Sequence, residues 1–186
     1  AVIIGMGGRG GGAGGNFLQA CKEVGVEGKI LGVADIFPNQ AKRAKDAFGV
    51  AEDKCFSGFD GYKKVLEIPG VNYAILAAPP GFRPVQFKAC IEAGKHVFME
   101  KPVAVDGPGC RVMYAAAEQA ESKGLKVAAG TQRAGTDTRL RVIERAHHAG
   151  VGSGGLVVGH DIAVAKLLRL QQVEEDPVVF GIEPVE

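Results

Sequence analysis

The sequence begins with a short apolar run that leads directly into a cluster of glycines. Residues 1–5 read AVIIG, and the hexapeptide 5–10 consists of Gly5, Met6, Gly7, Gly8, Arg9 and Gly10. This spacing fits the pattern GxGxxG, in which the first glycine permits a tight turn, the second lets a ligand approach the backbone, and the third lets a helix pack on the strand. The N–H groups and positive dipole end of that helix favour a bound phosphate. The feature therefore predicts a strand, a phosphate-binding loop and a helix.

An acidic residue supports this interpretation, because the glycine pattern alone is weak in a chain with 28 glycines among 186 residues. Residues 29–34 (KILGVA) predict a second strand, and Asp35 follows it. Its separation from Gly10 along the sequence is close to the distance of about 20 residues that the pattern requires. A carboxylate there accepts both ribose hydroxyls of NAD and repels a 2′-phosphate. Lys42 and Arg43 lie in the next predicted helix and keep NADP open as the alternative cofactor. A tight turn with an unliganded surface aspartate is the competing interpretation.

Short apolar runs alternate with segments of helical periodicity. Strands are predicted at residues 1–5, 29–34, 54–57, 72–78, 96–99 and 125–129. A first helix is predicted after the glycine loop and ends at about residue 24, and further helices are predicted at 39–48, 61–67, 84–93, 108–122 and 138–148. Apolar strands without strict alternation, separated by helices, indicate a parallel sheet that is covered on both faces. The predicted fold class is α/β, a doubly wound parallel sheet of order 3-2-1-4-5-6, the Rossmann fold.

Four further glycines stand where the first helix should begin: Gly11, Gly12, Gly14 and Gly15. Each glycine inside a helix costs roughly 1 kcal/mol relative to alanine. We therefore expect a frayed or late-starting first helix that is regular only from Asn16.

Three phrases in the middle of the chain resemble the Gfo/Idh/MocA family of oxidoreductases. They are AAPPGFRP at residues 77–84, AGKHVFMEKPVAVD at 93–106 and GTQR at 130–133, in the family's order. The resemblance covers residues 1–133 and implies an N-terminal Rossmann domain there that binds NAD or NADP. It also implies a C-terminal domain with an open sheet that forms the substrate pocket, and oxidation or reduction of a sugar or cyclitol hydroxyl.

The same resemblance assigns residue roles. Lys101 is implied to be the catalytic lysine beside the nicotinamide, and the Lys101–Pro102 bond to be cis. Glu100 is implied to orient the cofactor or the lysine, and Pro79 and Pro80 to shape the loop over the dinucleotide. The full set of expected cofactor-binding residues is Gly5, Gly7, Gly8, Arg9, Gly10, Asp35, Ala78, Pro79, Pro80, Glu100 and Lys101.

Residues 134–186 depart from the family pattern and predict only a short, incomplete remnant of the α+β substrate domain. His160 matches the family's catalytic histidine, but Leu156 and Ala163 stand where the family carries acids. A histidine at this place can act as an acid or base near neutral pH, and a surface histidine is the alternative. A shortened chain, a degenerate paralogue and a sequence that omits residues are the three possible explanations of this departure.

Two functions are compatible with the sequence. One is an NAD(P)-dependent sugar or cyclitol oxidoreductase, and the other is a non-catalytic dinucleotide-binding module.

The net charge and the composition restrict the classes of molecule that this protein is expected to bind. The chain has 22 Lys and Arg against 21 Asp and Glu. It therefore lacks the excess of basic residues that is typical of proteins that bind nucleic acid or an anionic membrane surface. No apolar run approaches the ~20 residues of a membrane span. The four cysteines form no CxxC pair, and no metal site is predicted. A small-molecule substrate and a cytoplasmic location are expected, while an exported form and a homo-oligomer stay open.

Overall fold

The computed structural model describes residues 1–130, which form one parallel sheet with helices on both faces. Every strand pair is parallel, and the order is β3-β2-β1-β4-β5-β6, which confirms the predicted topology. The strands are β1 (Val2–Ile4), β2 (Gly32–Asp35), β3 (Cys55–Ser57), β4 (Tyr73–Leu76), β5 (His96–Glu100) and β6 (Val127–Gly130). The expected boundary after residue 133 and the segment 134–186 lie outside the described residues and stay predictions.

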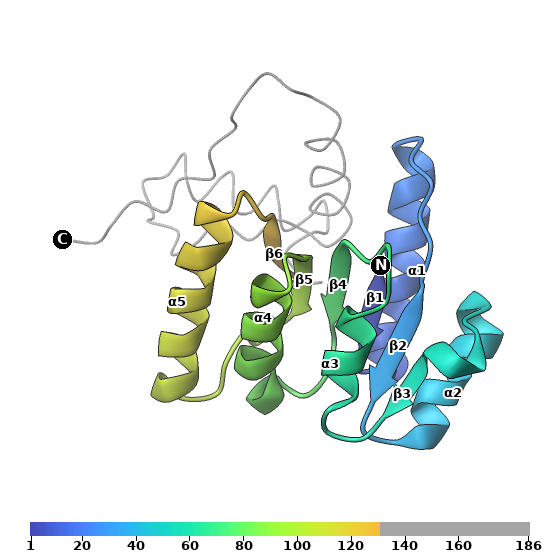
Figure 1. Cartoon of the computed structure of the whole chain (residues 1–186), viewed down its shortest axis with the longest axis horizontal. Helices are drawn as coiled ribbons and strands as arrows, with labels where there is room; N and C mark the ends of the chain where they lie inside the picture. The colour runs from blue at the N-terminus through green and yellow to red at the C-terminus, as the bar shows by residue number, and fades with distance from the viewer. Residues whose placement is uncertain (131–186) are drawn as a thin grey trace, which may run out of the picture.

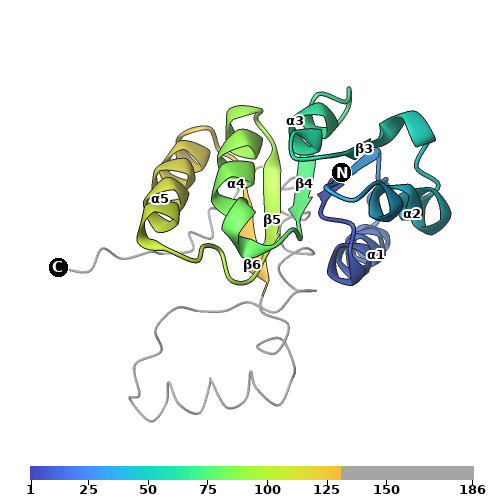
Figure 2. The same ribbon diagram turned by 90° about the horizontal axis from the view of Figure 1, so that it is seen from below.

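The helices divide between the two faces of the sheet. They are α1 (Gly8–Glu23), α2 (Pro38–Phe48), α3 (Gly61–Leu66), α4 (Arg83–Glu92) and α5 (Gly107–Ser122), with short 3₁₀ turns η1 (Glu52–Lys54) and η2 (Pro80–Phe82). Helices α3, α4 and α5 stand in a row before the sheet in Figure 1, and Figure 2 shows α1 on the opposite side. None of the helices within residues 1–130 has the length and apolarity that crossing a bilayer would need.

The central strands are apolar on both faces because both faces are covered. In β1, Ile3 belongs to a core cluster with Phe17 of α1, whereas Ile4 belongs to a second cluster with Phe87 of α4. Strands buried in this way show continuous apolar runs instead of alternation, which is the pattern that the sequence displays.

The prediction for the first helix is wrong. Helix α1 begins at Gly8 and runs through the glycine cluster, where close packing requires a small residue at Gly14. A Cβ atom on Gly14 would lie 2.6 Å from Ile3 Cδ1 and 2.7 Å from Phe48 Cζ. The helix gains more from this close contact than it loses through glycine's poor helix propensity.

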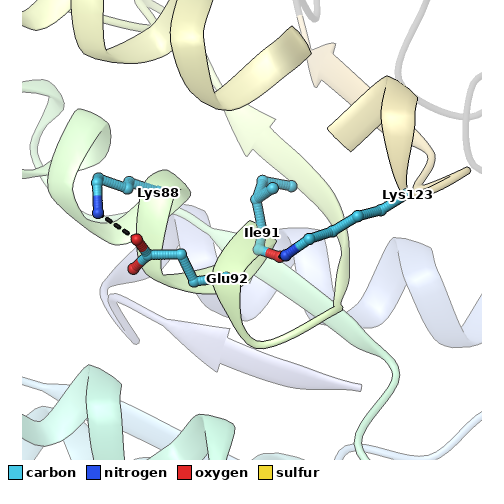
Figure 3. A network of polar contacts seen from close by, with 4 residues as sticks. All are labelled: Lys88, Ile91, Glu92 and Lys123. Carbon is cyan, nitrogen blue, oxygen red and sulfur yellow. Dashed lines mark hydrogen bonds and ion pairs between the residues drawn. The ribbon is translucent and has the colours of Figure 1, made fainter. Parts of the chain in front are cut away.

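A lysine directly after α5 contacts the end of α4. Lys123 Nζ donates to the carbonyl oxygen of Ile91 at 3.0 Å, and Lys88 pairs with Glu92 on the exposed side of the same helix (Figure 3). The last carbonyl groups of a helix lack intrahelical donors and form its negative dipole end. The Ile91 carbonyl oxygen also accepts from the Gly94 N–H at 3.1 Å, so Lys123 adds a cationic donor at the negative end of α4 and joins α4 to the end of α5.

We expect Lys123→Met to lower the free energy of unfolding by about 1 kcal/mol, because a carbonyl group near the helix dipole loses its cationic donor. Urea unfolding followed by circular dichroism measures the change. Lys88→Met is the matched control, and loss of its exposed ion pair should cost no more than about 0.5 kcal/mol. Equal effects of the two substitutions would contradict a capping role for Lys123.

Candidate functional site

The predicted site residues within residues 1–130 converge at the carboxyl ends of the strands. The glycine loop follows β1, Asp35 ends β2, Ala78 and Pro79 follow β4, and Lys101 follows β5. In parallel sheets these ends meet at one edge, where open α/β folds bind their ligands. His160 lies outside the described residues, so its predicted role is untested.

The backbone geometry requires glycine at two positions of the loop and leaves open space at a third. Gly5 has a φ of +95°, and a Cβ atom there would lie 2.4 Å from the backbone nitrogen of Ala78. A Cβ atom on Gly10 would lie 1.8 Å from the carbonyl oxygen of Gly5, so only glycine lets α1 approach β1 this closely. A Cβ atom on Gly7 would meet nothing within 4 Å. The space beside Gly7 is therefore open to a ligand.

The N-terminal end of α1 has the chemistry of an anion site. Gly7 is the N-cap, no side chain caps the helix, and its first turn carries no acidic residue. The first intrahelical bond runs from the Gly11 N–H to the Gly7 carbonyl, at 3.0 Å. Helix geometry thus leaves the N–H groups of Gly8, Arg9 and Gly10 without intrahelical acceptors, beside the positive end of the dipole. These groups fit a pyrophosphate.

Asp35 holds the glycine loop as well as facing the cleft. Its Oδ2 accepts from the Met6 N–H at 2.7 Å, and its Oδ1 accepts from the Phe37 N–H at 2.9 Å. An ionised carboxylate offers about four lone-pair positions, so capacity for two ribose hydroxyls remains. The contact with Met6 was not foreseen, because only the fold brings residues 6 and 35 together.

An apolar cleft of about 260 Å³ opens beside Asp35. Ile36, Phe59, Pro79 and Phe82 are among its lining residues. The rings of Phe59 and Phe82 lie 6.1 Å apart at a tilt of 48°, and these side chains are 70% and 42% exposed. Exposed aromatic rings at the mouth of an apolar cleft suit a flat heterocycle such as a purine base. The sequence prediction missed both phenylalanines.

Glu100 forms an ion pair with the glycine loop. Arg9 Nε and Glu100 Oε1 form an ion pair at 2.9 Å, and Glu100 is only 4% exposed. Lys101 follows with an exposed side chain, and its peptide bond to Pro102 is cis, as the resemblance implied. The ion pair links the loop after β1 to the end of β5.

Arg83, a residue that the sequence prediction left without a role, joins two loops of the site. It is 2% exposed, and its guanidinium donates to the carbonyl oxygens of Ala78, at 2.6 Å, and of Pro102. Burial lowers the pKa of Arg83, and the negative charge of Glu100 acts in the opposite direction. The available signal was an arginine at a helix start, inside the phrase GFRP.

The fold and the site define a dinucleotide-binding domain of Rossmann type. Residues 1–129 match the Gfo/Idh/MocA family, described as an oxidoreductase family with an NAD-binding Rossmann fold. The chain belongs to this family, which confirms the resemblance seen in the sequence.

Solved structures share the fold at low identity. An NAD-binding oxidoreductase from Klebsiella pneumoniae has a TM-score of 0.62 and 23% identity, over 78% of this chain and 38% of its own. The scyllo-inositol dehydrogenase from Lactobacillus casei, solved with NAD(H) and scyllo-inositol, has a TM-score of 0.61 and 23% identity, over 80% of this chain and 40% of its own. A 3-ketoreductase from Actinomadura kijaniata, solved with TDP-benzene and NADP, has a TM-score of 0.58 and 22% identity, over 81% of this chain and 43% of its own. No curated protein matches the sequence significantly. The chain thus spans about two fifths of the length of these structures.

Proposed function

We propose that this chain binds NAD at the carboxyl edge of its sheet and forms the cofactor half of a sugar or cyclitol dehydrogenase. The observation that carries the proposal is the combination of an uncapped α1 N-terminus, the Asp35 carboxylate and the apolar cleft along one edge. The helix N-terminus fits the pyrophosphate, the carboxylate fits the adenosine ribose, and the apolar cleft fits the adenine. Asp35 favours NAD over NADP, because a 2′-phosphate beside a carboxylate is repelled.

The chemistry at the substrate is assigned to Lys101. The bound nicotinamide supplies the hydride acceptor or donor. Lys101, at the end of β5 with an exposed side chain, accepts or donates the proton at the substrate oxygen, which is general acid–base catalysis. His160 is proposed as the second acid–base group. The family membership and the inositol dehydrogenase among the similar structures support a polyol substrate.

A second candidate function is dinucleotide binding without catalysis. Leu156 and Ala163 stand where the family pattern carries acids beside the histidine. Both candidates require the same cofactor site, so binding tests the site and turnover separates the two functions.

We expect Asp35→Asn to weaken NADH binding about 10- to 100-fold, because charge-assisted bonds to the ribose and to the Met6 N–H are lost. Isothermal titration of the 186-residue chain with NADH measures the dissociation constant, and a parallel NADPH titration should show a smaller loss. Asp53→Asn, at an exposed aspartate paired with Lys54, is the control and should bind NADH normally. Wild-type protein that binds neither dinucleotide would refute the proposal, and an unchanged Asp35→Asn titration would remove the ribose role of Asp35.

A further inference from the structure

Lys101 has an exposed side chain on a backbone that is held on both sides. The preceding residue, Glu100, is buried and paired with Arg9 of the glycine loop at 2.9 Å. The following residue, Pro102, accepts a hydrogen bond through its carbonyl oxygen from the guanidinium of Arg83. The two arginines come from α1 and α4, which lie on opposite faces of the sheet. The Lys101 backbone is therefore fixed relative to helices on both faces of the sheet.

Arg83 is the less expected of these two anchors. It is the first residue of α4, is followed by Pro84, and is almost completely buried. Its second bond goes to the Ala78 carbonyl oxygen, at 2.6 Å, in the loop after β4 that also lines the cleft. A buried guanidinium is costly, and an apolar side chain fills the same volume without that cost. What the guanidinium adds is geometry, because its rigid planar fork fixes two acceptors relative to each other.

We propose that Arg83 is the positioning residue for Lys101: through the carbonyl groups of Ala78 and Pro102 it holds the lysine segment at the edge of the dinucleotide cleft. The proposal rests on the function proposed above, in which Lys101 faces the nicotinamide. Arg83 touches neither cofactor nor substrate in this assignment. It acts by fixing the distance between the loop after β4, beside the cofactor, and the loop after β5, which carries the lysine.

Footprinting of lysines by reductive methylation, with formaldehyde and dimethylamine-borane, tests the proposal without a substrate. The 186-residue chain is labelled with and without NADH, and the rate at each lysine is read by peptide mass spectrometry. With NADH at about ten times its dissociation constant, Lys101 in the wild type should be labelled about tenfold more slowly. Lys22, exposed in the last turn of α1 and about 20 Å from the glycine loop, is the internal reference and should show no protection.

Arg83→Met should abolish the protection of Lys101 while NADH still binds, because the glycine loop and Asp35 remain in place. Arg83→Lys keeps the charge but replaces the fork with a single ammonium group, so it should restore part of the protection. Arg111→Met, at an exposed arginine of α5, is the matched control and should behave like the wild type. Calorimetry gives the NADH dissociation constant of each variant, and thermal unfolding shows that it is folded.

The possible outcomes separate this proposal from the function on which it rests. Wild-type protein that fails to bind NADH refutes the cofactor site itself. NADH binding without protection of Lys101 in the wild type refutes the placement of the lysine at the nicotinamide. Full protection in folded Arg83→Met overturns the positioning role. Failure of both Arg83 variants to fold would assign Arg83 to the stability of the core and would overturn the proposal as well.

Discussion

Gly10→Ala is expected to destabilise the domain by about 3 kcal/mol, at the upper end of the range for overpacking. The added Cβ atom would lie 1.8 Å from the Gly5 carbonyl oxygen and 2.9 Å from its carbon. Both are backbone atoms of the turn after β1, so no side chain can rotate away. Helix α1 would have to move off the sheet, and its N-terminal N–H groups would leave the phosphate position. Urea unfolding measures the stability, and NADH titration measures the loss of binding.

Gly12→Ala is the matched control in the same helix. Gly12 is exposed, and a Cβ atom on it would meet nothing within 4 Å. Alanine has the better helix propensity, so this substitution should stabilise the domain by up to about 1 kcal/mol. Opposite signs for two identical substitutions two positions apart would separate packing from propensity. A Gly10→Ala variant as stable as Gly12→Ala would contradict the close helix–strand contact.

The features that sequence reasoning predicted are those with a local or periodic cause. The strand order follows from apolar runs separated by helices, together with the right-handed crossover that such units adopt. The requirement for glycine at Gly5 and Gly10 follows from the turn and from the helix that begins after it. Both are properties of neighbouring residues, and one chain carries them without an alignment.

The features that it missed depend on contacts between distant segments. Propensity favoured a late start for α1, whereas the structure starts the helix at Gly8 because Gly14 packs against Ile3 and Phe48. Arg83 reaches a carbonyl group 19 residues away. The sequence identifies an arginine at a helix start but not the acceptors that the fold places around it. The bond from Met6 to Asp35 likewise spans 29 residues.

The chain belongs to an oxidoreductase family, and the carboxyl edge of its sheet has an uncapped helix N-terminus, a carboxylate and an apolar cleft. Binding by this edge and catalysis by the chain are separate properties, because the chain spans only about two fifths of the length of the similar structures. A variant that changes turnover without changing cofactor affinity distinguishes them.

Lys101→Met is that variant. We expect it to lower kcat for polyol oxidation by about 10²- to 10⁴-fold, the usual contribution of a positioned acid–base group. The side chain of Lys101 is exposed and lies outside the lining of the apolar cleft, so the NAD dissociation constant should change by less than about threefold, a difference under 1 kcal/mol. Absorbance of NADH during incubation of the 186-residue chain with NAD and a panel of inositols and aldoses measures the rate.

Two further substitutions decide how Lys101 acts. Lys101→Arg keeps a positive charge but holds its proton at all accessible pH values, so it should be as inactive as Lys101→Met if proton transfer is the role. Recovery of turnover in Lys101→Arg would instead assign the lysine to electrostatic stabilisation of the substrate oxygen. Lys22→Met, at the far end of α1, should leave kcat unchanged. Wild-type protein that binds NAD but turns over no polyol would favour the non-catalytic module, and turnover that survives Lys101→Met would remove Lys101 from the reaction.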